Sequence, residues 1–190
     1  MVVRDLAWGD FQQVAENYLA LYTEVEEDPD LGISLFPERP TLGAEAEWFA
    51  HLVRRVEEGQ TVAAVAEVKG AVVGLCTVDR KAPHREARHL GVLGILVARG
   101  SRGHGIGREL LEFAIARCRG KFEMIELCLF ASNVRARSLY RSVGFRTWGV
   151  LPRGVRRGDR YTDLEHMVLD LVDGVPRDGP AAGRPTEGGA

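Results

Sequence analysis

Three closely spaced glycines follow a strongly apolar stretch in the middle of the 190-residue chain. Gly103, Gly105 and Gly107 stand at alternate positions within the segment SRGHGIGREL, which begins at Ser101, shortly after the mostly apolar residues 89–98. Glycine loses more backbone entropy on folding than any other residue, so a run this dense requires a tight turn or a ligand in return. Apolar residues then recur at helical spacing, at Leu110, Leu111, Ala114 and Cys118. The pattern predicts a strand, a glycine loop and a helix, in that order.

The glycine loop can be compared with three phosphate-binding patterns. An ATP-binding P-loop ends in Gly-Lys-Ser/Thr, whereas Arg108 and Glu109 follow Gly107, so this pattern is excluded. A dinucleotide loop has the spacing G-x-G-x-x-G in an opening βαβ unit, whereas this loop reads G-x-G-x-G and follows several strands. The third pattern, R-x-x-G-x-G, matches residues 102–107. Taken alone, the loop leaves a plain turn and a phosphate ligand equally open.

The first half of the chain alternates between helical and strand patterns. Residues 2–6 predict a strand, and Asp10 can cap a helix that the acidic residues 24–30 interrupt. A second helix follows Thr41, with an apolar face at Trp48, Leu52 and Val56, and ends at Gly59. Residues 61–67 and 71–78 predict two strands that Lys69 and Gly70 join as a hairpin.

The second half adds a strand over residues 123–130, a helix over 132–144, and strands over 145–151 and 161–171 around a basic loop, 152–160. The predicted class is therefore α/β (α+β), with a mixed, mostly antiparallel sheet of six to seven strands and helices on both faces. We assign residues 1–172 to one domain. Residues 173–190 are rich in Gly and Pro and nearly free of apolar side chains, which predicts a disordered tail.

A second motif stands about 30 residues after the glycine loop. It reads N-x-x-A-x-x-L-Y-x-x-x-G-F and is formed by Asn133, Ala136, Leu139, Tyr140, Gly144 and Phe145. The two motifs together, in this order, resemble the GNAT superfamily of acyl-CoA N-acyltransferases. The resemblance covers residues 2–171 and is strongest over residues 90–145. It implies the twisted GNAT sheet, acetyl-CoA as co-substrate, no metal, and transfer of an acetyl group to a primary amine.

The resemblance also implies the coenzyme site. The pyrophosphate would lie against the glycine loop, where a helix N-terminus offers unpaired N–H groups and partial positive charge. The pantetheine arm would pair with the preceding strand. The residues expected to contact coenzyme A are Ile95, Leu96, Val97, Arg102, Gly103, His104, Gly105, Ile106, Gly107, Arg108, Asn133, Arg137 and Tyr140. For Asn133, capping of the following helix is the alternative.

The catalytic acid implied by the motif is Tyr140. A phenol has a pKa near 10 and stays protonated at neutral pH, so it can donate a proton to a departing thiolate. The resemblance does not identify the general base, because Leu93 stands where many family members carry glutamate. His89 and Glu126 are the substitutes, with water relays as a further alternative. A non-catalytic acyl-CoA-binding module is the second hypothesis for the whole chain.

Composition restricts the compartment and the partners. Cys76, Cys118 and Cys128 show neither CxxC pairing nor metal spacing, which indicates buried thiols in a reducing compartment. The formal net charge of −2 argues against nucleic-acid binding. With no apolar run long enough for a membrane span, we expect a cytoplasmic monomer or homodimer. Its partner would be an amine, either a small molecule or a protein N-terminal α-amine, selected by residues 24–41 and 151–160.

Overall fold

The computed structural model describes residues 1–28, 31–81 and 84–172. It contains one seven-stranded sheet in the order β1-β2-β3-β4-β5-β7-β6. The predicted tail, residues 173–190, lies outside the described residues. All neighbouring strands are antiparallel except β4 and β5, which are parallel. The predicted mixed, mostly antiparallel sheet is therefore confirmed.

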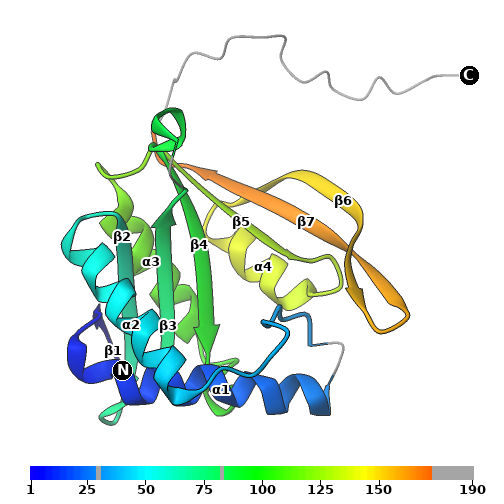
Figure 1. The fold of residues 1–190 in the computed structure, drawn as a ribbon. Helices are drawn as coiled ribbons and strands as arrows, with labels where there is room; N and C mark the ends of the chain where they lie inside the picture. Colours follow the sequence, from blue (N-terminus) through cyan, green and yellow to red (C-terminus); the bar gives the residue numbers. More distant parts are fainter. Residues whose placement is uncertain (29–30, 82–83, 173–190) are drawn as a thin grey trace, which may run out of the picture.

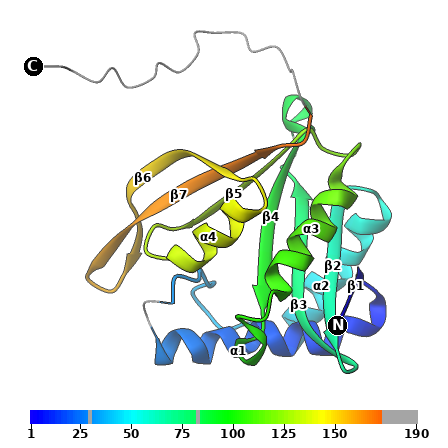
Figure 2. The ribbon, with the colours of Figure 1, turned by 180° about the vertical axis from the view of Figure 1, so that it is seen from behind.

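Helices cover both faces of the sheet, as predicted. The N-terminal half contributes β1 (Val2–Asp5), α1 (Phe11–Glu27), α2 (Leu42–Glu57), β2 (Thr61–Val68) and β3 (Ala71–Arg80). The C-terminal half contributes β4 (Leu90–Val97), α3 (Ile106–Cys118), β5 (Met124–Phe130), α4 (Val134–Ser142), β6 (Arg146–Arg157) and β7 (Arg160–Asp170). Helices α1 and α2 cover the face seen in Figure 1, and α3 and α4 cover the face seen in Figure 2.

Alternation along the strands explains this arrangement. On β2, Ala64 and Ala66 pack against α3 in the larger core, whereas Val65 between them packs with Val14 of α1 and Phe49 of α2. Successive side chains of a strand point to opposite faces, so a strand covered on both sides is apolar throughout. The unbroken run TVAAVAEV of β2 follows from this double burial.

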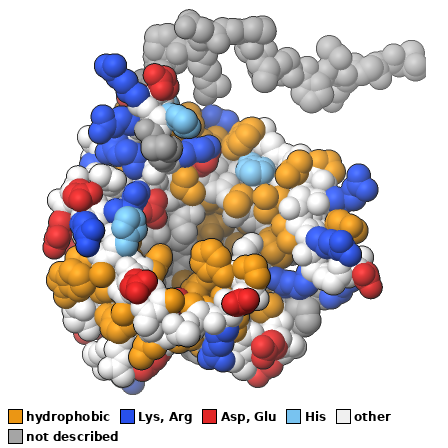
Figure 3. Space-filling model, in the orientation of Figure 1, with side chains coloured by type: hydrophobic (Ala, Val, Ile, Leu, Met, Phe, Trp, Pro, Cys, Tyr) orange, Lys and Arg blue, Asp and Glu red, His pale blue; other side chains and the backbone are white. Residues whose placement is uncertain are grey.

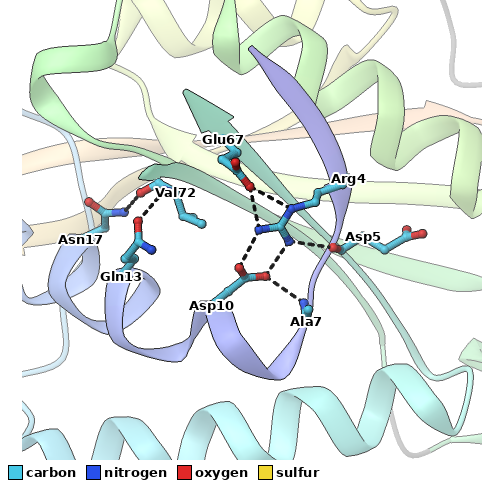
Figure 4. A network of polar contacts seen from close by, with 8 residues as sticks. All are labelled: Arg4, Asp5, Ala7, Asp10, Gln13, Asn17, Glu67 and Val72. Carbon is cyan, nitrogen blue, oxygen red and sulfur yellow. Dashed lines mark hydrogen bonds and ion pairs between the residues drawn. The ribbon is translucent and has the colours of Figure 1, made fainter. Parts of the chain in front are cut away.

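Polar contacts fix the start of α1 to the edge of the sheet (Figure 4). Arg4 of β1 donates to both carboxylate oxygens of Asp10, at 2.7 and 2.8 Å, and to Glu67 of β2. Gln13 and Asn17 bond the backbone of Val72 at the start of β3. Asp10 stands at the N-cap position, but its side chain accepts from Arg4 and the Ala7 N–H. The predicted cap of α1 by its side chain is therefore wrong.

The end of α1 and the buried face of α2 differ from the prediction. α1 continues through Glu24 to Glu27, because acidic side chains there meet arginines of the glycine loop. α2 buries Phe49, Leu52 and Val53, while Trp48 is 44 % exposed, so the predicted apolar face was turned by one position.

The predicted basic loop 152–160 is mostly strand. β6 runs to Arg157 and pairs with β7 across a two-residue turn, and Pro152 and Gly154 form an irregularity between Leu151 and Val155. The backbone N–H of Arg153 donates to Asp163 at 2.8 Å, which restores a contact across the irregularity. Pro and Gly therefore mark a bulge within a long hairpin here.

Candidate active site

β4 and β5 part after a short paired stretch, which opens the sheet near its centre (Figure 1). Parallel pairing joins residues 90–92 to residues 124–126 and ends there, although β4 continues to Val97. β3 pairs with the other edge of β4 over residues 91–97. The remaining edge of residues 93–97 can therefore accept an extended ligand as an added strand. The predicted contacts Ile95, Leu96 and Val97 lie on this edge.

The glycine loop connects this edge to α3. Gly103 and Gly105 both have φ of +82°, in the left-handed region that favours glycine, and Gly105 is the N-cap of α3. A Cβ on either glycine would meet nothing within 4 Å, so the loop borders open space. Within the part of the chain that the structure describes, the backbone N–H groups of residues 103–107 donate to no protein acceptor. Five unpaired donors at a helix N-terminus fit a pyrophosphate.

Side chains around the loop divide into exposed and buried ones. His104 is exposed, whereas Ile106 is 5 % exposed and packs in the core beneath α3. Ile106 therefore offers a ligand its backbone N–H only. Gly107 lies where a Cβ would come within 3.0 Å of the Leu139 side chain, so it permits close packing of α3 on α4.

The predicted arginines all have acidic partners. Arg102 donates to Glu24 of α1 at 2.6 and 3.2 Å, and its Nε donates to the Val97 carbonyl at 2.7 Å. Arg108 pairs with Glu112 at 3.3 Å. These contacts hold Arg102 against α1 and the end of β4, so its contact with a phosphate stays a prediction.

Arg137 and Asn133 hold the α4 side of the opening. The Arg137 guanidinium donates to buried Glu165 and to the Ala131 carbonyl. Asn133 accepts from the Ala136 N–H at 3.0 Å, so the helix-capping role is confirmed. Its amide also donates to the Gly32 carbonyl at 3.4 Å, which joins α4 to the segment between α1 and α2.

Tyr140 of α4 lies beneath the opening, because it belongs to the same core cluster as Leu93 and Leu127, which directly follow the last paired residues of β4 and β5. It is 9 % exposed, its ring packs at 5.8 Å from that of Phe145, and its hydroxyl makes no hydrogen bond within the described residues. No fully buried side-chain oxygen there lacks a partner, so this oxygen reaches the surface. Burial raises the pKa of the Tyr140 hydroxyl, and the thiols of Cys76 on β3 and Cys128 on β5 raise it further. The Tyr140 hydroxyl therefore stays protonated at neutral pH.

The base candidates differ in position. Glu126 of β5 pairs with Val92 at the last contact before the strands part, and its carboxylate meets Lys81 at 2.6 Å. His89 is exposed and precedes β4, about 10 Å along the strand from this point. Leu93 is buried in the core on the α3 side, so it leaves no base at that position. Glu126 is the better placed of the two.

Three residues of this region escaped the sequence prediction. Lys81, Glu24 and Glu165 have no predicted role in the sequence analysis. Each pairs with a residue at least 28 positions away, at Glu126, Arg102 and Arg137. No local pattern indicates such pairs. Cys128, predicted to be buried, is exposed.

A cavity of about 230 Å³ lies beside the opening, on the face covered by α1 and α2. Its walls are mostly apolar and come from α1, α2, β3, β4 and residues 33–34, and include Val14, Tyr18, Leu21, Trp48, Leu75 and Leu96. Figure 3 shows this face hollowed near its centre, with hydrophobic side chains around the hollow. The apolar cavity is the candidate acceptor pocket. Among the described residues, no group of three or more side chains could hold a metal, and no helix could span a membrane.

Residues 13–145 match the family model described as "Acetyltransferase (GNAT) family". The chain belongs to this family. It is an N-acetyltransferase, and structures with the same fold hold acetyl-CoA.

Similar proteins agree with this fold and are also named acetyltransferases. L-methionine sulfoximine/L-methionine sulfone acetyltransferase of Pseudomonas aeruginosa is 24 % identical over 171 residues, 89 % of this chain and 94 % of that protein. Ribosomal-protein-alanine N-acetyltransferase from Brucella melitensis is 29 % identical, with a TM-score of 0.75 over 90 % of this chain and 99 % of that one. A phosphinothricin acetyltransferase from Sinorhizobium meliloti, in complex with acetyl-CoA, is 21 % identical, with a TM-score of 0.77 over 97 % and 95 %.

Proposed function

We propose that the protein transfers an acetyl group from acetyl-CoA to an α-amine by direct attack within a ternary complex. The observation that carries this proposal is the Tyr140 hydroxyl, protonated and without a protein partner, beneath the opening between β4 and β5. A donor in this position suits a reaction in which a thiolate leaves.

The chain binds and orients the acyl donor through its backbone. Bound acetyl-CoA supplies an activated thioester. The N–H groups of residues 103–107 hold the pyrophosphate, and the open edge of β4 at residues 93–97 aligns the pantetheine arm. A backbone N–H at this edge polarises the thioester carbonyl. Tyr140 donates its proton to the departing sulfur.

Deprotonation of the amine falls to Glu126, through water, with Lys81 holding its carboxylate. A carboxylate that is already paired with Lys81 suits an acceptor amine that loses its proton easily. At pH 7 an α-amine costs about 1 kcal/mol to neutralise, whereas a lysine-like amine costs about 4.6 kcal/mol. The energetic difference favours an α-amine as acceptor.

The names of two relatives support the same acceptor class. One acts on L-methionine sulfoximine and L-methionine sulfone, and the other on an alanine of a ribosomal protein. Each of these acceptors offers an α-nitrogen. Free amino acids and protein N-termini are therefore the two forms of acceptor to compare.

Release of coenzyme A thiol, measured with both substrates varied, tests the proposal. Free amino acids, short peptides and polyamines serve as acceptors. We expect turnover with α-amines and intersecting reciprocal plots, the pattern of a ternary complex. Parallel plots would indicate a covalent acetyl-enzyme, and turnover with polyamines alone would overturn the α-amine assignment.

A further inference from the structure

One histidine lies on the acceptor side of the sheet, outside the groups that the proposed reaction uses. His166 belongs to β7, which lies next to β5 on the side away from β4 (Figure 1). Its neighbours in the chain, Glu165 and Met167, point toward α4 and the larger core. Successive side chains of a strand alternate between the two faces. The imidazole of His166 therefore lies on the same side of the sheet as α1, α2 and the apolar cavity.

Strand register places His166 next to the opening. Val92 and Glu126 form the last pair before β4 and β5 part, and Cys128 lies about 7 Å further along β5. His166 pairs directly with Cys128, whereas Glu126 pairs with Val168, two residues from His166. Glu126 and His166 are therefore diagonal neighbours on one face of an antiparallel pair. Such neighbours lie about 7–8 Å apart, a separation that long and aromatic side chains can bridge.

Trp148 of β6 packs against the imidazole. The centres of the Trp148 and His166 rings lie 5.4 Å apart, with the ring planes inclined at 51°. A contact of this kind orients a ring without using its nitrogens. Within the described residues, no buried side-chain nitrogen lacks a partner, and no residue bonds either ring nitrogen of the partly buried His166. The ring nitrogens therefore reach the surface and can exchange protons with water.

The titratable and charged groups near His166 come from both neighbouring strands. On β5 they are Cys128, directly opposite, and Glu126, diagonal to it. On β6 the guanidinium of Arg146 donates to Asp170 at 2.8 Å. Among side chains of these kinds, histidine is the one that ordinarily changes charge closest to neutral pH, which suits a carrier of protons.

We infer that His166 receives the proton that Glu126 draws from the acceptor amine through water. This inference rests on the proposed function and completes its proton path. One N–H bond of the ammonium group breaks, its electron pair stays on the nitrogen, and the proton passes over water to the imidazole and then to solvent. Glu126 can therefore remain paired with Lys81 throughout the reaction.

The remaining proton is accounted for at Tyr140. The neutral amine attacks the thioester carbon with its electron pair, and the bond between carbon and sulfur breaks. Tyr140 protonates the departing thiolate and recovers a proton from the new amide nitrogen. His166 thus removes the first proton of the amine, and Tyr140 transfers the second to sulfur.

Removal of the imidazole tests the inference, with the free amino acids and short peptides of the acceptor screen as substrates. His166→Ala should lower kcat about 100-fold at pH 7 and leave KM for acetyl-CoA nearly unchanged. The loss should shrink at pH 9, because more of each acceptor amine is already neutral there. His51→Ala is the matched control, since this histidine is exposed on α2 and does not line the apolar cavity.

Free imidazole provides a second readout. His166→Ala leaves space beside the Trp148 ring, so added imidazole should raise kcat of this variant about tenfold. A merely structural loss would lower Tm and would not respond to imidazole. A normal kcat of His166→Ala, or a loss that imidazole does not relieve, would overturn the role of His166 and leave the proposed function intact. A wild-type protein that acetylates no α-amine would instead reject the proposed function itself.

Discussion

The three glycines of the loop have two different structural roles. Gly103 and Gly105 adopt the left-handed conformation, and both border open space where a ligand can approach the backbone. Gly107 instead allows Leu139 of α4 to pack against the first turn of α3. The R-x-x-G-x-G pattern therefore combines an anion-binding loop with a helix-packing contact.

Gly105→Glu should abolish binding of coenzyme A. The substitution strains a left-handed position and adds negative charge among the unpaired N–H groups. Gly100→Glu is the matched control, because it adds the same charge in the same loop at a glycine with open space and ordinary φ. Calorimetric titration with coenzyme A measures both. Equal affinity of the two variants would contradict the assignment of the loop.

Tyr140→Phe should lower kcat about 100-fold and leave the affinity for coenzyme A nearly unchanged. Because burial raises the pKa of Tyr140 above its usual value near 10, kcat of the wild-type protein should show no loss from Tyr140 ionisation up to about pH 10. A pH profile of kcat for both proteins checks this. A normal kcat of the Tyr140→Phe variant would mean that water or another group protonates the leaving thiolate.

Ion pairs between distant elements hold the walls of the opening. Arg102 joins the glycine loop to α1, and Arg137 joins α4 to β7 through Glu165. Glu165 is 4 % exposed and also accepts from the Thr147 hydroxyl. Burial alone would raise the pKa of Glu165, but the hydrogen bonds from Thr147 and Arg137 outweigh it and lower that pKa below its usual range.

The lowered pKa of Glu165 has a consequence for acid stability. Its contribution to folding is complete above the unfolded-state pKa of 4.5 and is lost as the pH falls through the lower folded-state pKa. Glu165→Gln should cost about 3 kcal/mol of the free energy of unfolding at pH 7 and make stability less dependent on pH below 4.5. Urea unfolding at pH 7 and at pH 3 measures both. Glu112→Gln, in an exposed pair, should change little, and equal effects of the two variants would refute the role of Glu165.

The sequence predicts elements better than it predicts contacts between them. Apolar periodicity and turn residues are local, so the order of strands and helices and the hairpin at Lys69 followed from them. The cap by Asn133 was one of two alternatives that the sequence left open. The end of β6 could not be predicted from local patterns, because β6 continues through Pro152 and Gly154 by pairing with β7. The Lys81–Glu126 pair depends on the register of two strands, which no short pattern encodes.

At the scale of the whole molecule, one opening in the sheet brings three regions together. The glycine loop lies at one end of β4, Tyr140 lies beneath the gap, and the apolar cavity and His166 flank it on the α1 and β6–β7 sides. Residues 31–34 connect these sides through Asn133 and Arg157. Selection of the acceptor by residues 24–41 and 151–160 stays a prediction, as do the cytoplasmic location and the oligomeric state.

Direct transfer is the central claim. Cys128 allows a sharp test of it, because this exposed thiol lies on β5 just beyond the last residue that pairs with β4. A single-turnover reaction is run with the protein in excess over acetyl-CoA and an α-amino acid, then quenched and followed by intact-mass spectrometry. We expect the acetyl group to appear on the acceptor while the protein mass stays constant throughout. Acetyl-protein that forms and decays at the rate of transfer, or an acceptor that gains no acetyl group, would contradict the account.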